Sequence, residues 1–250
     1  MSALTAIRSP MGPTDRVREL IVAEIFGPTF QGEGPSLGRR CSFLRLSGCN
    51  LHCSWCDTPY TWDWTGRTGT RFDRTRESSR MRLDTVFEEL VKHGTHMLVI
   101  TGGEPLLQQR RLVPLLDMCA ARDWRVEVET AATIVPLAEI IARVTQFNVS
   151  PKLANSGNEE DKRYRPEAID ALQASERSVW KFVVSDRADL GEVQSLVDRH
   201  GLRPIYIMPE GSTSQVIIER TREIASDVLA RGWNLTTRLQ ILLWGNQRGV

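Results

Sequence analysis

Three cysteines are crowded into eight residues of this chain. Cys49, Cys53 and Cys56 lie in the stretch GCNLHCSWCDT with the spacing C-x3-C-x2-C, whereas the two other cysteines, Cys41 and Cys119, stand apart. Thiolates bind soft metals, and three of them at this spacing can converge on one centre. A structural zinc site uses four ligands, and an electron-transfer iron–sulfur cluster uses four cysteines. Three cysteines therefore indicate a 4Fe-4S cluster with one iron left open for an outside ligand.

Glycines and polar residues stand at the ends of three predicted strands further along the chain. LVITGGEPLLQ places Gly102, Gly103 and Glu104 after an apolar run, and ligands of parallel α/β sheets bind at the carboxyl ends of strands. An ordinary strand-to-helix turn also favours glycine followed by proline, so this motif alone leaves both interpretations open. The next two strand ends carry Glu129, in VEVETAAT, and Ser150 with Lys152, in NVSPK.

Short apolar runs alternate with amphipathic stretches over most of the chain. The runs are rich in β-branched residues and nearly continuous in apolar character, as strands buried on both faces are. This alternation predicts βαβ units and an α/β fold with a mostly parallel sheet, either open or curled into a barrel. The predicted strands are SFLRLS, HMLVITG, RVEVET, QFNVS, VWKFVVS and RPIYIMP, with LTTRLQILL closing the chain. The first predicted helix, DTVFEELVKHG, has Asp84 as its N-cap and Gly94 as its stop.

The composition is that of an ordinary globular protein. The 250 residues are 41% hydrophobic and 25% charged, with a net charge of +1, which argues against wholesale binding to nucleic acid or to a membrane. No stretch approaches the ~18 apolar residues of a membrane span, and the unevenly spaced cysteines do not resemble a secreted disulfide framework. We therefore expect a soluble, cytoplasmic protein. Residues 1–19 show no periodicity and are predicted to be flexible, and residues 20–250 are predicted to form one domain.

One segment, at about residues 65–82, interrupts the alternation. It holds six arginines together with Asp73 and Glu77. A solvated insertion loop and a phosphate- or partner-binding loop both explain such a run of charge. The sequence does not decide between these two interpretations.

The cysteine motif, with Trp55 before its last cysteine, resembles that of the radical S-adenosylmethionine superfamily. In that superfamily the open iron binds the amino and carboxylate groups of S-adenosylmethionine. The element FQGEG, followed by FLRLSGCNLHCSWCDT, is similar to the 7-carboxy-7-deazaguanine synthase family. The resemblance runs from about Glu24 through IMPEG to the terminal LQILLWGNQRG, so it covers most of the chain.

This resemblance implies an incomplete TIM-like β/α barrel and a homodimer. It also implies a lyase that converts 6-carboxy-5,6,7,8-tetrahydropterin into 7-carboxy-7-deazaguanine with release of ammonia, in queuosine-type 7-deazapurine biosynthesis. The implied cofactors are a 4Fe-4S cluster, S-adenosylmethionine and Mg²⁺. The implied protein partner is an external one-electron reductant such as a flavodoxin, with no nucleic-acid or membrane partner.

The residues that match the family's motifs suggest roles in the site. The implied cluster ligands are Cys49, Cys53 and Cys56, and the implied Mg²⁺ ligand is Thr58. The implied catalytic residues are Arg45 and Glu33. The residues implied around S-adenosylmethionine are Trp55, Asp57, Gly103, Glu104, Glu129, Ser150, Lys152, Lys181, Phe182, Val183 and Val184. Those implied around the pterin are Phe30, Gln31, Gly32, Arg45 and Thr101.

Several of these residues also have a purely structural interpretation. Arg45 suits the surface of a sheet, Thr58 suits the cap of the following turn, and Glu129 suits a helix cap or a surface charge. The apolar members of residues 181–184 are explained by a buried strand. Two other functions remain open for the whole protein. One is a glycyl-radical-enzyme activase that acts on a protein partner, and the other is a non-enzymatic module stabilised by zinc or an iron–sulfur cluster.

Overall fold

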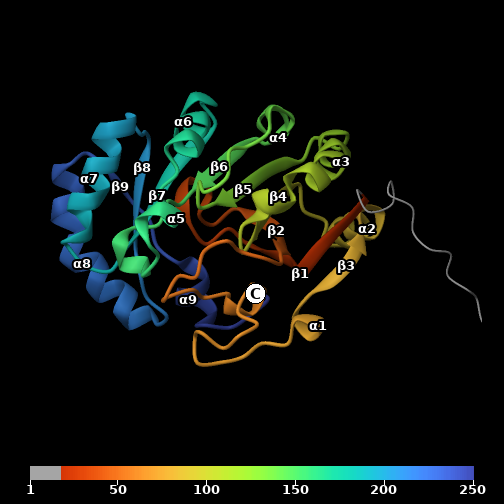
Figure 1. Ribbon diagram of the computed structural model, residues 1–250, viewed down its shortest axis with the longest axis horizontal. Coiled ribbons are helices and arrows are strands. Elements are labelled where there is room, and N and C mark those ends of the chain that lie inside the picture. The colour runs from red at the N-terminus through yellow and green to blue at the C-terminus, as the bar shows by residue number, and fades with distance from the viewer. Residues whose placement is uncertain (1–17) are drawn as a thin grey trace, which may run out of the picture.

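The computed structural model describes residues 18–250, which form one curved sheet covered by helices on its outer side (Figure 1). The strands are β1 (Glu19–Phe30), β2 (Arg40–Leu46), β3 (Ser79–Arg82), β4 (Met97–Gly102), β5 (Arg125–Thr130), β6 (Gln146–Val149), β7 (Ser178–Val184), β8 (Ile205–Pro209) and β9 (Asn234–Leu235). The helices are α1 (Arg74–Glu77), α2 (Leu83–Lys92), α3 (Gln109–Ala120), α4 (Ala138–Arg143), α5 (Glu160–Arg163), α6 (Pro166–Ala174), α7 (Asp189–His200), α8 (Ser214–Ala230) and α9 (Leu239–Trp244). Short 3-10 turns are η2 (Gly34–Ser36), η3 (Pro59–Thr61), η4 (Pro105–Gln108) and η5 (Ala154–Ser156).

The sheet is a partial barrel. Its strand order is β3-β1-β2-β4-β5-β6-β7-β8-β9, so β3 and β9 are two edges that do not pair with each other. All pairs from β2–β4 to β8–β9 are parallel, and β1 is antiparallel to both of its neighbours. Because parallel strands end at the same edge, the loops that follow them gather at one opening. The predicted mostly parallel, incomplete β/α barrel is confirmed.

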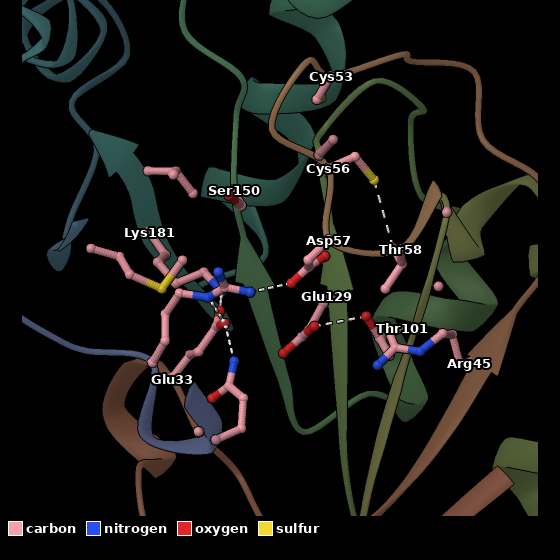
Figure 2. Close-up of a pocket in the computed structure, with 18 of the residues that line it drawn as sticks. Glu33, Arg45, Cys53, Cys56, Asp57, Thr58, Thr101, Glu129, Ser150 and Lys181 are labelled. Atoms are coloured by element: carbon pink, nitrogen blue, oxygen red, sulfur yellow. Dashed lines mark hydrogen bonds and ion pairs between the residues drawn. The ribbon is translucent and has the colours of Figure 1, made fainter. Parts of the chain in front are cut away.

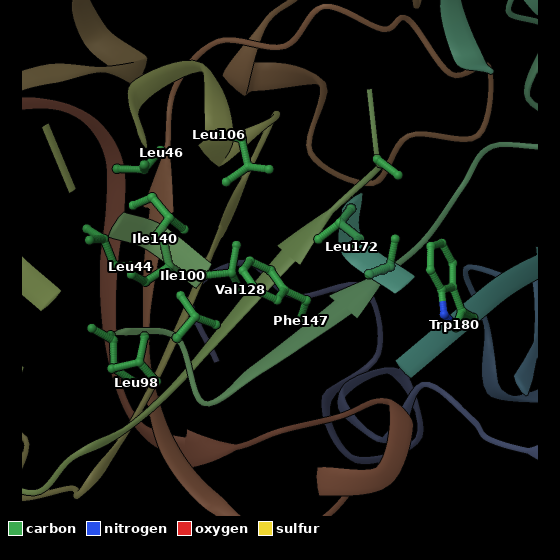
Figure 3. Close-up of a cluster of buried hydrophobic side chains, with 14 of the residues drawn as sticks. Leu44, Leu46, Leu98, Ile100, Leu106, Val128, Ile140, Phe147, Leu172 and Trp180 are labelled. Atoms are coloured by element: carbon green, nitrogen blue, oxygen red, sulfur yellow. The ribbon is translucent and has the colours of Figure 1, made fainter. Parts of the chain in front are cut away.

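Alternation along each strand separates the core from the barrel interior. Leu44, Ile100, Val128 and Phe147 point outward into the hydrophobic core beneath the helices, where each is 0% exposed (Figure 3). Their sequence neighbours point to the inner side, which is also closed to solvent over much of its depth. Both faces are therefore buried, which explains the nearly continuous apolar runs.

Two expectations about local structure are wrong. The closing stretch LTTRLQILL is not a strand, because the chain leaves the sheet after Leu235 and continues into α9. The Leu239 backbone N–H donates to the Gly32 carbonyl at 2.9 Å, which ties this segment across the barrel opening. Helix α2 begins at Leu83 with Arg82 in the N-cap position, so Asp84 lies in its first turn.

The third difference concerns the N-terminal half. The sequence patterns did not reveal β1, a twelve-residue strand with two register shifts. The end of the predicted basic insertion at residues 65–82 is β3, which pairs with the start of β1. The predicted flexible segment 1–19 lies outside the described residues except for its last two positions, and Glu19 already belongs to β1. Within the described range, no helix is both long and apolar enough to cross a membrane.

Candidate active site

The three clustered cysteines lie in the loop that follows β2, at the barrel opening. Cys49, Cys53 and Cys56 all line one pocket and pack with Leu51 and Ala131. Figure 2 shows Cys53 and Cys56 on this loop, with Asp57 and Thr58 following them toward the rest of the pocket. The structure thus brings together the predicted cluster ligands and the carboxyl ends of the parallel strands.

Each of the three sulfur atoms accepts a hydrogen bond from a nitrogen. The donors are Leu51 N to Cys49 Sγ at 3.4 Å, Asn158 Nδ2 to Cys53 Sγ at 3.3 Å, and Trp62 Nε1 to Cys56 Sγ at 3.3 Å. Hydrogen bonds of this kind stabilise thiolate ligands and tune the metal centre. Within residues 18–250, neither Cys41 nor Cys119 accepts such a bond, and both are fully buried. The donor set fits an iron–sulfur cluster on the three clustered cysteines.

The arrangement does not suit a mononuclear zinc centre. No group of three or more His, Cys, Asp or Glu side chains in the described part of the chain is placed to hold a single metal ion. Thiolates around a four-iron cluster lie farther apart than ligands around one zinc ion. Burial raises the pKa of Cys49 to about 12 and also raises the pKa values of Cys53 and Cys56. Metal binding would therefore release the thiol protons.

The glycine pair at the end of β4 packs directly against the cysteine loop. A Cβ on Gly103 would lie 2.2 Å from the Gly48 carbonyl oxygen and 2.8 Å from the Cys49 Cβ, closer than atoms can pack. Gly102 has φ +143°, and a Cβ there would lie 2.1 Å from the Leu46 carbonyl oxygen. Glycine is therefore required at both positions because two backbones meet there. Gly103 lines the pocket, as predicted for a cofactor contact.

Glu104 has a structural role that the sequence did not reveal. Its side chain is 1% exposed and does not line the pocket. Its carboxylate accepts hydrogen bonds from Thr130 Oγ1, Ala131 N and Leu106 N at 2.9 to 3.0 Å. These bonds tie the end of β4 to the end of β5. The predicted contact of the Glu104 side chain with the cofactor is therefore not supported by this geometry.

Trp55, Ser150 and Lys152 form one polar group beside the cysteines. Lys152 Nζ donates to Ser150 Oγ at 2.9 Å and lies 5.5 Å from the centre of the Trp55 ring. The Trp55 indole N–H donates to Asn155 Oδ1 at 3.3 Å, which fixes the ring. All three predicted residues line the pocket, where they present a cation and a hydroxyl to a bound group.

The four residues predicted on β7 divide between two faces. Lys181 and Val183 line the pocket, whereas Phe182 and Val184 are 0% exposed in the hydrophobic core. The physical reason is the two-residue period of a strand, which turns neighbouring side chains to opposite faces. The side chains of Phe182 and Val184 therefore cannot line the cofactor pocket, which corrects the prediction for these two residues.

Arg45 projects from β2 into the pocket beside its cross-strand neighbour Glu24. Its Nε donates to Glu24 Oε2 at 2.9 Å, and Tyr60 OH donates to the same oxygen at 2.7 Å. Within residues 18–250, the two terminal nitrogens of Arg45 form no hydrogen bond, so this edge of the guanidinium is available to a planar acceptor. Arg248 from the C-terminal segment also pairs with Glu24.

Glu129 lies among the predicted substrate residues. Thr101 Oγ1 donates to Glu129 Oε2 at 2.7 Å, and Gln31 Nε2 donates to Glu129 Oε1 at 3.2 Å (Figure 2). Thr101 is also the cross-strand neighbour of Arg45. These four side chains therefore form a polar row from the residue after β1 across β2, β4 and β5. Neither the surface charge nor the helix cap considered for Glu129 describes this position.

Glu33 is enclosed by donors from distant parts of the chain. Its Oε2 pairs with Lys181 Nζ, and its Oε1 accepts a hydrogen bond from Gln240 Nε2 at 2.9 Å. Arg238 Nε lies 3.6 Å from the same Oε1. Burial alone would raise the pKa of Glu33, but the charges of Lys181 and Arg238 outweigh it and lower the pKa to about 2. Burial also disfavours the protonated form of Lys181, but the negative charges of Glu33 and Glu129 outweigh this effect and raise the pKa of Lys181.

The remaining predicted residues also line the pocket. Phe30, at the end of β1, is 43% exposed and stacks on Trp244 of α9 at 6.4 Å between ring centres. Gly32 is packed so tightly against Gln240 that a Cβ would lie 1.7 Å from its Oε1. Asp57 is ion-paired with Arg238. Thr58 occupies the N-cap position of η3, but its side chain makes no capping hydrogen bond.

Arg238 and Gln240 are pocket residues that the sequence patterns missed. They lie in LTTRLQILL, which was interpreted as an ordinary buried strand. The available signal was an arginine and a glutamine within an otherwise apolar run. Their spacing by two does not place them on one face, because Arg238 is the N-cap of α9 and Gln240 lies in its first turn. Only the path of the chain across the barrel opening places both side chains beside Glu33.

We expect Arg45→Lys to weaken substrate binding and to leave cofactor binding nearly unchanged. Lysine keeps the positive charge but loses the planar fork, and a charge-assisted hydrogen bond contributes about 1.5–3 kcal/mol. The apparent substrate constant should rise by roughly 10- to 100-fold. Cleavage of S-adenosylmethionine in the absence of substrate should stay near the wild-type rate. Arg40→Lys is the matched control, because Arg40 lies at the opposite end of β2 and its side chain donates to the Gly94 and His93 carbonyls. Equal loss of both activities would make Arg45 structural.

Comparison with known proteins agrees with this geometry. Residues 44–181 match the family model described as the radical SAM superfamily. The 7-carboxy-7-deazaguanine synthase of Pyrobaculum aerophilum is 36% identical over 96% of this chain and 100% of its own length. That of Halobacterium salinarum is 32% identical over 94% of this chain and 92% of its own length.

A solved structure supports the fold as well. The crystal structure of QueE from Escherichia coli superposes with a TM-score of 0.66 at 25% identity, covering 88% of this chain and 93% of that protein. The family-model match spans the cysteine loop and the strands from β4 to β6, and the two synthases match at least 94% of this chain. The chain belongs to the 7-carboxy-7-deazaguanine synthase family of the radical SAM superfamily.

Proposed function

We propose that this protein is a radical S-adenosylmethionine carbon–nitrogen lyase that converts 6-carboxy-5,6,7,8-tetrahydropterin into 7-carboxy-7-deazaguanine and releases ammonia, in queuosine-type 7-deazapurine biosynthesis. One observation carries this proposal. A single pocket joins three cysteines suited to a 4Fe-4S cluster with the polar row of Gln31, Arg45, Thr101 and Glu129. A cofactor and a small polar substrate can therefore meet inside one enclosed site.

The test is an anaerobic incubation of the cluster-loaded protein with S-adenosylmethionine, a one-electron reductant and the carboxypterin, followed by product mass. Formation of 7-carboxy-7-deazaguanine with ammonia supports the proposal. Cleavage of S-adenosylmethionine without any conversion of the carboxypterin would favour a glycyl-radical-enzyme activase. A preparation that binds zinc and no iron would favour the non-enzymatic module.

The cofactor side comprises the cysteines and the group around Lys152. When bound, the cluster and S-adenosylmethionine supply the radical chemistry that the side chains of the protein lack. Trp55, Ser150 and Lys152 line the pocket where they can hold the polar parts of S-adenosylmethionine. Gly103 lines the pocket and, because it lacks a side chain, lets the end of β4 pack against the cysteine loop. These residues bind and orient the cofactor, and the buried walls exclude water.

The substrate side comprises the polar row and Glu33. A pterin edge carries a cyclic amide and an amino group, which call for paired acceptors and donors. Glu129 supplies acceptors and Gln31 supplies both kinds of group, so we assign Glu129 to the substrate rather than to the cofactor. The free edge of Arg45 suits the substrate carboxylate. Glu33 stays ionised in its cationic surroundings and provides a second acceptor.

We assign a Mg²⁺ ion to Thr58, next to the substrate carboxylate. Mg²⁺ binds oxygen, keeps several waters and is often held by few protein atoms together with the substrate. Two observations support Thr58. Its hydroxyl lines the pocket, and it makes no capping hydrogen bond, its nearest polar contact being the Cys56 Sγ at 3.7 Å. The ion would neutralise the carboxylate and fix the orientation of the ring.

Thr58→Ala should therefore remove most of the stimulation of turnover by Mg²⁺ and leave the iron content unchanged. Thr58→Ser keeps the hydroxyl and should retain the Mg²⁺ response. The measurement is the rate of product formation with and without added Mg²⁺, alongside the iron content of each variant. If Thr58→Ala responds to Mg²⁺ as the wild type does, the hydroxyl is not a ligand.

Three further proposals concern partners and location. We propose an external one-electron reductant, such as a flavodoxin, because the cluster must receive an electron before each cleavage. We propose a homodimer from family membership, to be tested by sedimentation. We propose a cytoplasmic location, since five free cysteines suit a reducing compartment.

A further inference from the structure

Arg238 reaches across the barrel opening from the segment that follows β9. Its side chain is 10% exposed, although it lies in a short stretch between the sheet edge and α9. Nη1 donates to the Gly211 carbonyl at 2.7 Å, and Nη2 donates to Asp57 Oδ2. Nε faces Glu33 and has no hydrogen-bond partner, despite being buried within the described structure. One guanidinium thus touches three segments that are far apart in sequence.

The two carboxylates beside Arg238 belong to different halves of the site. Asp57 immediately follows the last cysteine of the cluster loop and precedes Thr58. Glu33 lies on the substrate side, held by Lys181 and Gln240. The Asp57 side chain is 48% exposed, whereas that of Glu33 is 14% exposed. Arg238 is therefore the buried member that pairs with a half-exposed carboxylate of the cluster loop.

The charges in this group balance. Lys181 and Arg238 provide two cations, and Glu33 and Asp57 provide two carboxylates. A planar fork can hold two acceptors in fixed directions at once, which an ammonium on a flexible stem cannot do. Here the hydrogen bonds to Asp57 and to the Gly211 carbonyl fix the plane of the guanidinium, and Nε faces Glu33 at 3.6 Å as an ion pair without a hydrogen bond. Two hydrogen bonds thus fix the orientation of the Arg238 guanidinium between Asp57 and Glu33. We call this arrangement of Arg238, Asp57 and Glu33 the clamp.

We propose that Arg238 is a positioning residue that fixes the cofactor-side Asp57 relative to the substrate-side Glu33. This inference rests on the proposed function, since it requires both a cofactor and a substrate in the pocket. Arg238 would thereby keep the cofactor and the substrate aligned with each other. A misplacement of about 1 Å between reacting groups can lower a rate by roughly 100-fold without abolishing binding. Loss of the clamp should therefore separate cofactor cleavage from product formation.

The main experiment compares Arg238→Gln and Arg238→Lys with the wild type. The measured quantity is the ratio of S-adenosylmethionine cleaved to 7-carboxy-7-deazaguanine formed. We expect this ratio to rise by about tenfold or more in both variants, because neither glutamine nor lysine reproduces the fork. Iron content should be unchanged. Calorimetric affinities for S-adenosylmethionine and for the carboxypterin, each measured without reductant, should change by less than about fivefold.

Two controls separate positioning from general damage. Arg125→Gln removes another arginine from an ion pair with a buried carboxylate, that of Glu127, at the amino end of β5 and away from the pocket. Its cleavage-to-product ratio should match the wild type. Asp57→Asn removes the other partner of the Arg238–Asp57 ion pair. It should therefore also raise the ratio of S-adenosylmethionine cleaved to product formed. The double variant Arg238→Gln/Asp57→Asn should be no worse than the more affected single variant, because both changes remove one interaction.

Each other outcome is decisive. Proportional loss of cleavage and product in Arg238→Lys, or a wild-type ratio in either Arg238 variant, overturns the inference and leaves the proposed function intact. If Arg238→Gln does not fold, the result for Arg238→Lys decides, since it retains the charge that the buried carboxylates need. A wild-type protein that makes no product from the carboxypterin overturns the proposed function, and the inference with it.

Discussion

Cys53→Ala is expected to lose the cluster and all turnover of the carboxypterin. With two thiolates left, the site cannot hold a 4Fe-4S cluster that also keeps one iron open. Cys53 is 7% exposed, and its sulfur accepts a hydrogen bond from Asn158, as suits a buried thiolate ligand. The measurement is iron per chain after anaerobic reconstitution, together with the absorbance of the cluster and product formation. Cys49→Ala and Cys56→Ala should behave in the same way.

Cys119→Ala is the matched control for this result. Cys119 lies in α3, where it is 0% exposed in the hydrophobic core, and it does not line the pocket. The variant should lose about 1 kcal/mol of stability through lost packing and keep its full iron content. Wild-type iron content in Cys53→Ala, or loss of iron in Cys119→Ala, would contradict the assignment of the cluster ligands.

Glu33→Gln is expected to impair both stability and catalysis. The change leaves Lys181 without its paired carboxylate and Arg238 with Asp57 alone, and breaking a buried ion pair costs about 3–5 kcal/mol. It also removes an acceptor from the substrate side of the pocket. Urea unfolding at pH 7 should show the loss of stability, and product formation should fall by at least about 100-fold. Glu89→Gln, which disrupts an exposed pair with Lys92, should change stability by less than about 0.5 kcal/mol.

The pH dependence of the free energy of unfolding provides a second test of this prediction. The folded-state pKa of Glu33 is lowered to about 2, below the ordinary value of 4.5, so the ionised carboxylate stabilises the folded state. That contribution is fully present above pH 4.5 and is lost as the pH falls from 4.5 toward 2. The difference in unfolding free energy between wild type and Glu33→Gln should therefore shrink as the pH is lowered through this range. A difference that stays constant from pH 6 to pH 3 would show that the charge of Glu33 contributes little.

Contiguous features of the sequence were sufficient for the family and the architecture. The spacing of Cys49, Cys53 and Cys56 indicates the cluster because ligands within eight residues must lie close together in any fold. Apolar runs that alternate with amphipathic ones predict the parallel strands, and glycines at positions 102 and 103 mark a strand end that a side chain would block. Family membership agrees with all of these inferences.

The face of a strand that meets the pocket, and the secondary structure of the closing segment, were less predictable from the sequence. The two-residue period shows that Lys181 and Val183 share one face and that Phe182 and Val184 share the other, but it does not show which face meets the pocket. Similarly, LTTRLQILL has the composition of a strand, but the chain leaves the sheet after Leu235 and forms α9 from Leu239. The polar character of Glu104 suggested ligand binding, whereas its carboxylate satisfies the backbone at the end of β5.

The sequence by itself therefore determined the cluster motif, the parallel strands and the family, because each rests on residues that are neighbours in the chain. Only the tertiary structure decided the polar chemistry of the pocket. Glu33 meets Lys181 across 148 residues, and Asp57 meets Arg238 across 181 residues. Nothing in a local pattern encodes such pairs. They form because the barrel brings the loop after β1, the end of β7 and the segment after β9 to one opening, where the buried charges must neutralise one another.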